Sequence, residues 1–116
     1  MTQIKIYHNP RCSKSRKTLE IIEQQGHKPE IIKYLDTPPT IEELQNVLSL
    51  LKLQPRDLMR KNEAEYKDNN MSDESLSKDE LIALMYKFPK VIERPIVINN
   101  NKAVIGRPPE SVLTII

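Results

Sequence analysis

The first third of the chain changes from a strand-like to a helix-like spacing of hydrophobic residues and back again. Residues 3–7 place Ile4 and Ile6 on one face, which predicts a short strand ended by the His-Asn-Pro segment at 8–10. From residue 13 or 14 to residue 25 the apolar positions follow a helical spacing, and Gly26 is the residue type that ends helices. A second β-branched run at 30–35 completes a strand, helix, strand unit, for which parallel pairing and a right-handed crossover are expected.

The middle of the chain has the spacing of helices. Two capping-box signals, Thr40 with Glu43 and Ser77 with Glu80, each precede apolar residues on one helical face. Residues 55–60 predict a short helix with proline at an early position, and residues 67–70 form a polar break. Pro89 is expected to end the helix that starts after Ser77.

The last part of the chain returns to strands. Residues 96–98 and 103–105 are apolar and flank an Asn-rich turn, a pattern typical of a β-hairpin. A final helix is expected after residues 106–109, with its apolar positions at 112, 113, 115 and 116. The order βαβ, helical insertion, ββα predicts an α/β protein with a thioredoxin-like fold and a helical insertion between its two halves.

Length and composition favour one small domain over residues 1–116. With 116 residues, of which 38% are hydrophobic, the chain can bury one modest core. No apolar run approaches the roughly 18 to 20 residues that cross a bilayer, and the start has no secretory pattern, so we expect a cytoplasmic protein. The net charge of +2 does not indicate a nucleic-acid binder. We therefore expect a protein that binds neither nucleic acid nor membrane, and we take a monomer as the working expectation.

Cys12 is the only cysteine, and its position favours a reactive thiol. It lies at the predicted start of the first helix, where unpaired N–H groups and the helix dipole stabilise a thiolate. Four basic residues lie within five positions of it: Arg11, Lys14, Arg16 and Lys17. Such settings lower a cysteine pKa from ~8.5 to roughly 3.5 to 7.5, and they also attract an oxyanion. The alternative is a small, buried and unreactive cysteine.

The residues that follow Cys12 exclude two common types of cysteine site. A Cys-x5-Arg phosphatase loop would need arginine where the chain has Thr18, and a Cys-x-x-Cys motif would need cysteine where it has Ser15. A lone thiol can form an adduct, but a thiol from another molecule must resolve it. With two histidines, His8 and His27, no metal site is expected.

Five separated blocks resemble the glutaredoxin-coupled arsenate reductase family (ArsC type). They are Tyr-His-Asn-Pro-Arg-Cys-Ser-Lys-Ser-Arg at 7–16, Tyr-Leu-Asp-Thr-Pro-Pro at 34–39, Leu-Met-Arg-Lys at 58–61, Glu-Arg-Pro-Ile-Val at 93–97 and Gly-Arg-Pro at 106–108. Their order and spacing are those of the family, and the match spans nearly the whole chain. Arg11, Ser13 and Lys14 stand where better-studied members tend to have small or uncharged residues, so the chain resembles an ArsC-like subgroup.

The resemblance implies an arsenate reductase with no bound cofactor. Cys12 would attack arsenate and form a thioarsenate adduct, which glutathione and then glutaredoxin, both external reductants, would resolve to arsenite. Arg60 and Arg94 would bind the oxyanion, and Arg107 would lower the thiol pKa. Pro95 resembles the cis-proline found beside the thiol in thioredoxin-like folds.

Each of the remaining polar residues near the thiol has two possible roles. His8, Asn9 and Ser15 could hydrogen-bond the thiolate, or they could hold its loop and cap the turn and the helix. Arg16 and Arg56 are interpreted as solvated surface residues.

Two other functions stay open. A transcription regulator of the Spx type shares the fold and an Arg-Pro-Ile element and binds RNA polymerase, although such regulators commonly carry the Cys-x-x-Cys switch that Ser15 interrupts here. A glutathione-dependent thiol oxidoreductase acting on another substrate is the second alternative.

Overall fold

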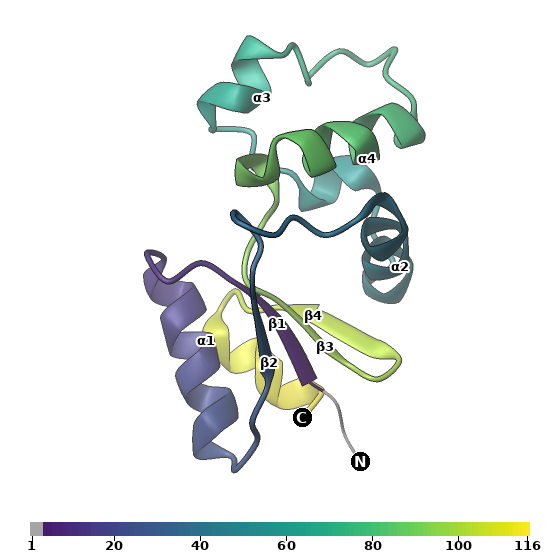
Figure 1. Cartoon of the computed structure of the whole chain (residues 1–116). Helices are drawn as coiled ribbons and strands as arrows, with labels where there is room; N and C mark the ends of the chain where they lie inside the picture. The colour runs from purple at the N-terminus through teal and green to yellow at the C-terminus, as the bar shows by residue number, and fades with distance from the viewer. Residues whose placement is uncertain (1–3) are drawn as a thin grey trace. The chain divides into compact units, whose positions relative to one another are not determined.

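The computed structural model describes residues 4–116 and divides the chain into two compact units (Figure 1). The first unit contains Met1–Thr37 and Arg94–Ile116, and the second contains Pro38–Glu93. Gln3, at which the first strand was expected to begin, lies outside the described residues.

The first unit is built on a four-stranded sheet in the order β2-β1-β3-β4. These strands are β1 (Ile4–His8), β2 (Glu30–Lys33), β3 (Ile96–Asn99) and β4 (Lys102–Ile105). β1 pairs in parallel with β2 and antiparallel with β3, with Tyr7 opposite Ile32 and Ile96. The predicted parallel pair and the C-terminal hairpin are therefore confirmed, and the hairpin turn places Asn100 at a φ of 57°, a conformation that asparagine tolerates well.

One face of this sheet is covered by α1 (Ser13–Gln24) and by a C-terminal 3-10 helix, η3 (Pro109–Thr114) (Figure 1). The core on this face combines apolar positions predicted for the first strand and first helix with one residue each from β3 and η3: Ile4, Ile6, Ile21, Ile22, Val97 and Val112. The expected final helix is thus present but has 3-10 hydrogen bonding, with the N–H of Ser111 donating to the Pro108 carbonyl at 2.9 Å. Its six residues, the first of which is the second of two consecutive prolines, are few for an α-helix.

β2 is shorter than the run of apolar residues that predicted it. It ends at Lys33, whose carbonyl accepts the N–H groups of Asp36 and Thr37 at 3.0 and 2.9 Å. These turn bonds replace strand pairing at Tyr34 and Leu35.

The second unit is helical. It contains α2 (Ile41–Leu51), η1 (Pro55–Leu58), α3 (Ala64–Asp68), α4 (Lys78–Lys87) and η2 (Pro89–Val91). Both predicted capping boxes are present, since Thr40 Oγ1 accepts from Glu43 N and Ser77 Oγ accepts from Glu80 N, each at 3.1 Å. The short helix α3 was not predicted. The polar break predicted at residues 67–70 overlaps the last two residues of this helix.

Arg56 contradicts the interpretation as a solvated residue. Its guanidinium is partly buried and donates to the carbonyls of Met71 (2.6 Å) and Asp73, with Tyr66 Oη at 3.4 Å. Arg56 therefore fastens the segment after α3 to η1. The sequence pattern could not show this because the acceptors lie 10 to 17 positions away.

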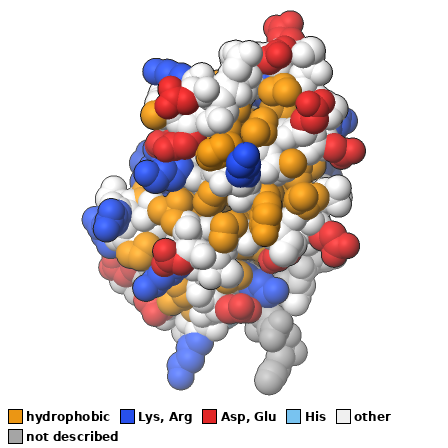
Figure 2. Space-filling model, turned by 45° about the horizontal axis from the view of Figure 1, so that its top comes forward, with side chains coloured by type: hydrophobic (Ala, Val, Ile, Leu, Met, Phe, Trp, Pro, Cys, Tyr) orange, Lys and Arg blue, Asp and Glu red, His pale blue; other side chains and the backbone are white. Residues whose placement is uncertain are grey.

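Charged side chains of both signs lie between hydrophobic ones on the face of the molecule shown in Figure 2. This mixture fits the small net charge of +2. Within residues 4–116, no helix has the length and apolar character needed to cross a membrane.

Candidate active site

Cys12 ends the loop that connects β1 to α1. Its N–H donates to the Asn9 carbonyl at 3.0 Å, its own carbonyl accepts from Arg16 N at 3.0 Å, and its backbone is extended as the N-cap of α1. The thiol is partly exposed. The predicted placement of a cysteine at a helix N-terminus is thus observed, and the interpretation as a fully buried cysteine is wrong.

Ser15 holds this loop from inside the first turn of α1. Its buried hydroxyl accepts from Asn9 N at 3.0 Å and is 2.7 Å from Nδ1 of His8, which is itself buried. Asn9 Oδ1 in turn accepts from Arg11 N at 3.0 Å. The hydrogen bonds of His8, Asn9 and Ser15 therefore support the loop-holding interpretation of these residues.

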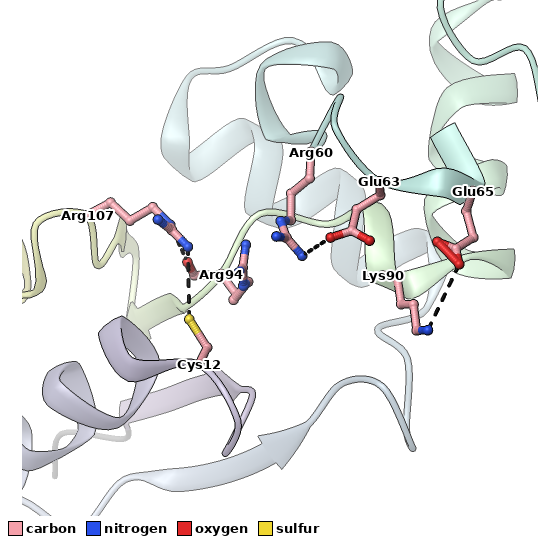
Figure 3. A network of polar contacts seen from close by, with 7 residues as sticks. All are labelled: Cys12, Arg60, Glu63, Glu65, Lys90, Arg94 and Arg107. Carbon is pink, nitrogen blue, oxygen red and sulfur yellow. Dashed lines mark hydrogen bonds and ion pairs between the residues drawn. The ribbon is translucent and has the colours of Figure 1, made fainter. Parts of the chain in front are cut away.

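Two arginines at the open end of the β3-β4 hairpin, Arg94 before β3 and Arg107 after β4, meet near the thiol (Figure 3). Arg107 Nη2 donates to Cys12 Sγ at 4.0 Å, and Arg107 Nε donates to the Arg94 carbonyl at 2.9 Å. Topology explains the meeting: β1 and β3 are antiparallel, so residues before β3 lie beside the loop that follows β1. The Arg94–Pro95 and Arg107–Pro108 peptide bonds are both cis.

The electrostatic environment favours the thiolate of Cys12. Burial by itself raises the pKa of the thiol, but the backbone N–H of Ser15, the charge of Arg94, the N–H of Lys14 and the charge of Arg107 outweigh it, so the pKa lies below its ordinary value. The predicted lowering of the Cys12 pKa is therefore confirmed. The arginine charges that lower it, however, come from Arg94 and Arg107, which are distant in sequence. The neighbouring basic side chains are exposed, and Arg16 Nη1 donates instead to the Pro10 carbonyl at 2.8 Å.

Arg60 belongs to the helical unit. Its N–H donates to the Val91 carbonyl at 2.6 Å, and its Nη1 forms an ion pair with Glu63 Oε1 at 2.6 Å (Figure 3). The two side chains are 27% and 26% exposed, so both are partly accessible from solvent. Its role in oxyanion binding stays a prediction.

No group of three or more His, Cys, Asp or Glu residues that could hold a metal ion occurs between residues 4 and 116. The groups that surround Cys12 are the two arginines and the backbone N–H groups at the start of α1.

The strand order and the thiol at the start of α1 define a thioredoxin-like thiol protein. The sequence profile of the ArsC family matches residues 7–115. The chain belongs to the ArsC family, which confirms the resemblance found in its sequence blocks.

Relatives of known name support this membership. The chain is 51% identical over 115 residues to YfgD, described as an uncharacterized protein of Escherichia coli K12, covering 98% of this chain and 97% of the relative. It is 43% identical to an arsenate reductase of Neisseria meningitidis, covering 97% of both chains. The solved structure of an arsenate reductase from Vibrio cholerae is 51% identical and superposes with a TM-score of 0.96, covering 99% of this chain and 98% of the other.

Proposed function

We propose that this chain is an arsenate reductase that uses glutathione and glutaredoxin as external reductants. The observation that carries the proposal is the thiol of Cys12, held at the start of α1 with Arg107 at 4.0 Å and its pKa lowered. Relatives named arsenate reductase support the choice of oxyanion. Because the family profile extends over both units, we treat residues 1–116 as one ArsC-like domain, acting as a cytoplasmic monomer.

The reaction begins with attack of the Cys12 thiolate on arsenic. A Sγ–As bond forms, and an arsenate oxygen leaves as water after taking up protons. Glutathione thiolate then attacks Sγ: a Sγ–S bond forms, the Sγ–As bond breaks, and its electron pair reduces As(V) to As(III), which leaves as arsenite. Glutaredoxin takes the glutathionyl group from Cys12 by thiol–disulfide exchange and restores the thiolate.

The arginines serve the charged species of this sequence. Arsenate carries one to two negative charges near neutrality, and a planar guanidinium can donate to two of its oxygens at once. Arg94 and Arg60 are proposed to bind the anion, and Arg107 to stabilise the thiolate. Pro95, which precedes β3 next to Arg94, helps to define the position of that arginine.

The test is arsenate-dependent oxidation of NADPH in the presence of glutathione, glutaredoxin and glutathione reductase. The wild type should turn over and Cys12→Ser should not. Arg94→Ala should lower kcat/KM for arsenate by roughly 10²- to 10³-fold, the usual effect of losing one oxyanion donor. Lys28→Ala is the matched control, because Lys28 is an exposed cation that lies before β2, at the end of that strand away from the Cys12 loop.

Two results would overturn the proposal: no turnover of arsenate by the wild type, or undiminished turnover by Cys12→Ser. Turnover of a different oxyanion under the same conditions would preserve the thiol chemistry and replace the substrate.

A further inference from the structure

A pocket of about 310 Å³ lies on the other side of the Cys12 loop from the two arginines. Its walls are residues 8–11, the last residue of β2, Lys33, and two residues that follow β2, Leu35 and Asp36, all within the sheet-containing unit. In the order β2-β1-β3-β4, β2 and β3 flank β1 on opposite sides. The loop after β1 therefore has this pocket on its β2 side and Arg94 and Arg107 on its β3 side.

The pocket has a distinct pattern of charge. Arg11 and Lys33 supply two cations and Asp36 supplies one carboxylate, while Pro10 and Leu35 add apolar surface. These three charged side chains form no ion pair with one another in the described part of the chain. Burial is the main cause of the lowered pKa of His8, which lies in the same pocket wall, and the charge of Lys33 is the second cause. The charge of Lys33 therefore acts within the pocket.

Two cations and one carboxylate complement a small zwitterion with two carboxylates and one ammonium group. Glutathione has this arrangement, on a tripeptide with a thiol in its middle. We propose that this pocket binds the glutathione that resolves the Cys12 adduct, with Arg11 and Lys33 receiving its two carboxylates and Asp36 its ammonium group. The proposal rests on the proposed function, because it assigns a site to the reductant of that reaction.

The direction of attack supports this location. Displacement at a sulfur atom proceeds with the attacking thiolate opposite the leaving group. If arsenic is held on Sγ by the arginines of the β3 side, the incoming thiolate has to approach from the side of β2. The pocket wall and Cys12 belong to one tight turn, in which Cys12 N donates to Asn9 O at 3.0 Å. Cys12 directly follows Arg11, so its Cα lies about 3.8 Å from that of a residue of the pocket wall.

A binding experiment tests the pocket without turnover. The probe is S-methylglutathione, which keeps all three charges and cannot form a disulfide, titrated into isotopically labelled Cys12→Ser protein. The backbone amide signals of Arg11, Leu35 and Asp36 should shift on binding. Arg11→Ala and Lys33→Ala should each weaken binding roughly three- to tenfold, and Lys28→Ala should not. Both pocket cations are exposed, so these variants are expected to fold.

Steady-state kinetics then separates this inference from the proposed function. Lys33→Ala should raise the KM for glutathione and leave the KM for arsenate unchanged. No binding of S-methylglutathione, or amide shifts confined to residues around Arg94 and Pro95, would overturn the pocket assignment even if arsenate is reduced normally. Binding at the predicted amides without any arsenate turnover would preserve the pocket and sink the proposed function instead.

Discussion

Arg107 takes part in two interactions at the site, one through each end of its guanidinium. Nη2 approaches the thiol of Cys12 at 4.0 Å while Nε is fixed by the Arg94 carbonyl at 2.9 Å. A cation fixed in this way does not have to lose side-chain freedom when the thiolate forms. Its charge therefore stabilises the anion more effectively than that of an exposed lysine on a flexible side chain.

Replacing Arg107 with alanine should raise the pKa of Cys12, because it removes a positive charge that favours the thiolate. The measurement is the rate of alkylation by iodoacetamide as a function of pH, whose midpoint should move upward. Arg107→Lys should move it less, and Arg16→Ala should leave it in place, because the exposed Arg16 guanidinium donates to the Pro10 carbonyl and not to the thiol. Equal midpoints for the wild type and Arg107→Ala would show that Arg107 does not stabilise the thiolate.

Gly106 lies where the hairpin packs against α1. A Cβ atom at this position would meet Thr18 Oγ1 at 2.5 Å and Pro95 Cγ at 2.8 Å, both closer than normal contacts, and the residue is buried. The N–H of Gly106 also donates to the Pro95 carbonyl at 2.9 Å, so the backbone has little room to retreat.

We expect Gly106→Ala to lower the free energy of unfolding by about 1–3 kcal/mol, the usual cost of overpacking. Urea unfolding measures this loss, and adding Thr18→Ala should recover part of it by removing two of the three close atoms. If Gly106→Ala lowers the free energy of unfolding and the added Thr18→Ala does not recover any of it, the clash with Thr18 is not the cause. Alanine at Gly26 has open space around it, but a φ of 85° makes that variant strained for a different reason.

The sequence predicted the position of some single residues and not the contacts of others. Cys12 could be placed from local signals, since a strand end, a loop and a helix start follow one another around it. The packing of Gly106 on Thr18 and the carbonyl contacts of Arg56 depend on tertiary structure and have no local signal. The convergence of Arg94 and Arg107 on the thiol entered only through the resemblance to a family.

At the scale of elements, the two longest helices of the helical unit, α2 and α4, each begin with a capping box. In each box the N-cap hydroxyl accepts from the N3 backbone, and the N3 glutamate accepts from the N-cap backbone at 3.1 Å. Each box therefore satisfies two N–H groups that a helix start leaves without partners.

Thr40→Ala and Ser77→Ala should each reduce the free energy of unfolding by about 1 kcal/mol. Ser49→Ala is the matched control, since Ser49 is an exposed serine inside α2 and alanine is the better helix former. Chemical denaturation of the three variants provides the comparison. A loss in Ser49→Ala as large as in Thr40→Ala would show that capping is not the cause.

Elements with a strong periodic pattern were predicted well, and short ones were not. α1, α2 and α4 and the two hairpin strands lie where hydrophobic spacing and caps placed them. α3 has only five residues, too few to show a helical period, and η3 forms tighter turns than its apolar spacing suggested. Tertiary contacts decide the form of such short segments.

At the scale of the whole molecule, the order of elements was the most predictable property. The order of elements follows from the points at which the spacing of hydrophobic residues changes between that of a strand and that of a helix. Each of these changes was visible in the sequence. The partition into two compact units was not foreseen, because the chain leaves the first unit after Thr37 and returns to it at Arg94 without a flexible or low-complexity linker.

Stability of the whole chain should depend on pH through His8. This side chain is buried, and burial lowers its pKa, as do the charges of Lys33 and Arg16, while Glu23 opposes them. In the unfolded chain histidine takes up a proton near pH ~6.5, whereas in the folded protein His8 does so only at lower pH. Between these two values the unfolded state binds more protons, so stability falls as the pH drops below about 6.5, by at most about 1.4 kcal/mol per pH unit.

The measurement is urea unfolding between pH 5.5 and 7.5 in a Cys12→Ser background, because the lowered pKa of Cys12 gives stability the same sign of pH dependence. His8→Gln should flatten the profile, since the titrating group is gone while an amide can still bond to Ser15. His27→Gln is the control, because it removes the other histidine of the chain and leaves the pair of His8 and Ser15 intact. An unchanged slope in His8→Gln would assign the pH dependence to other groups and would mean that the buried imidazole protonates equally well in both states.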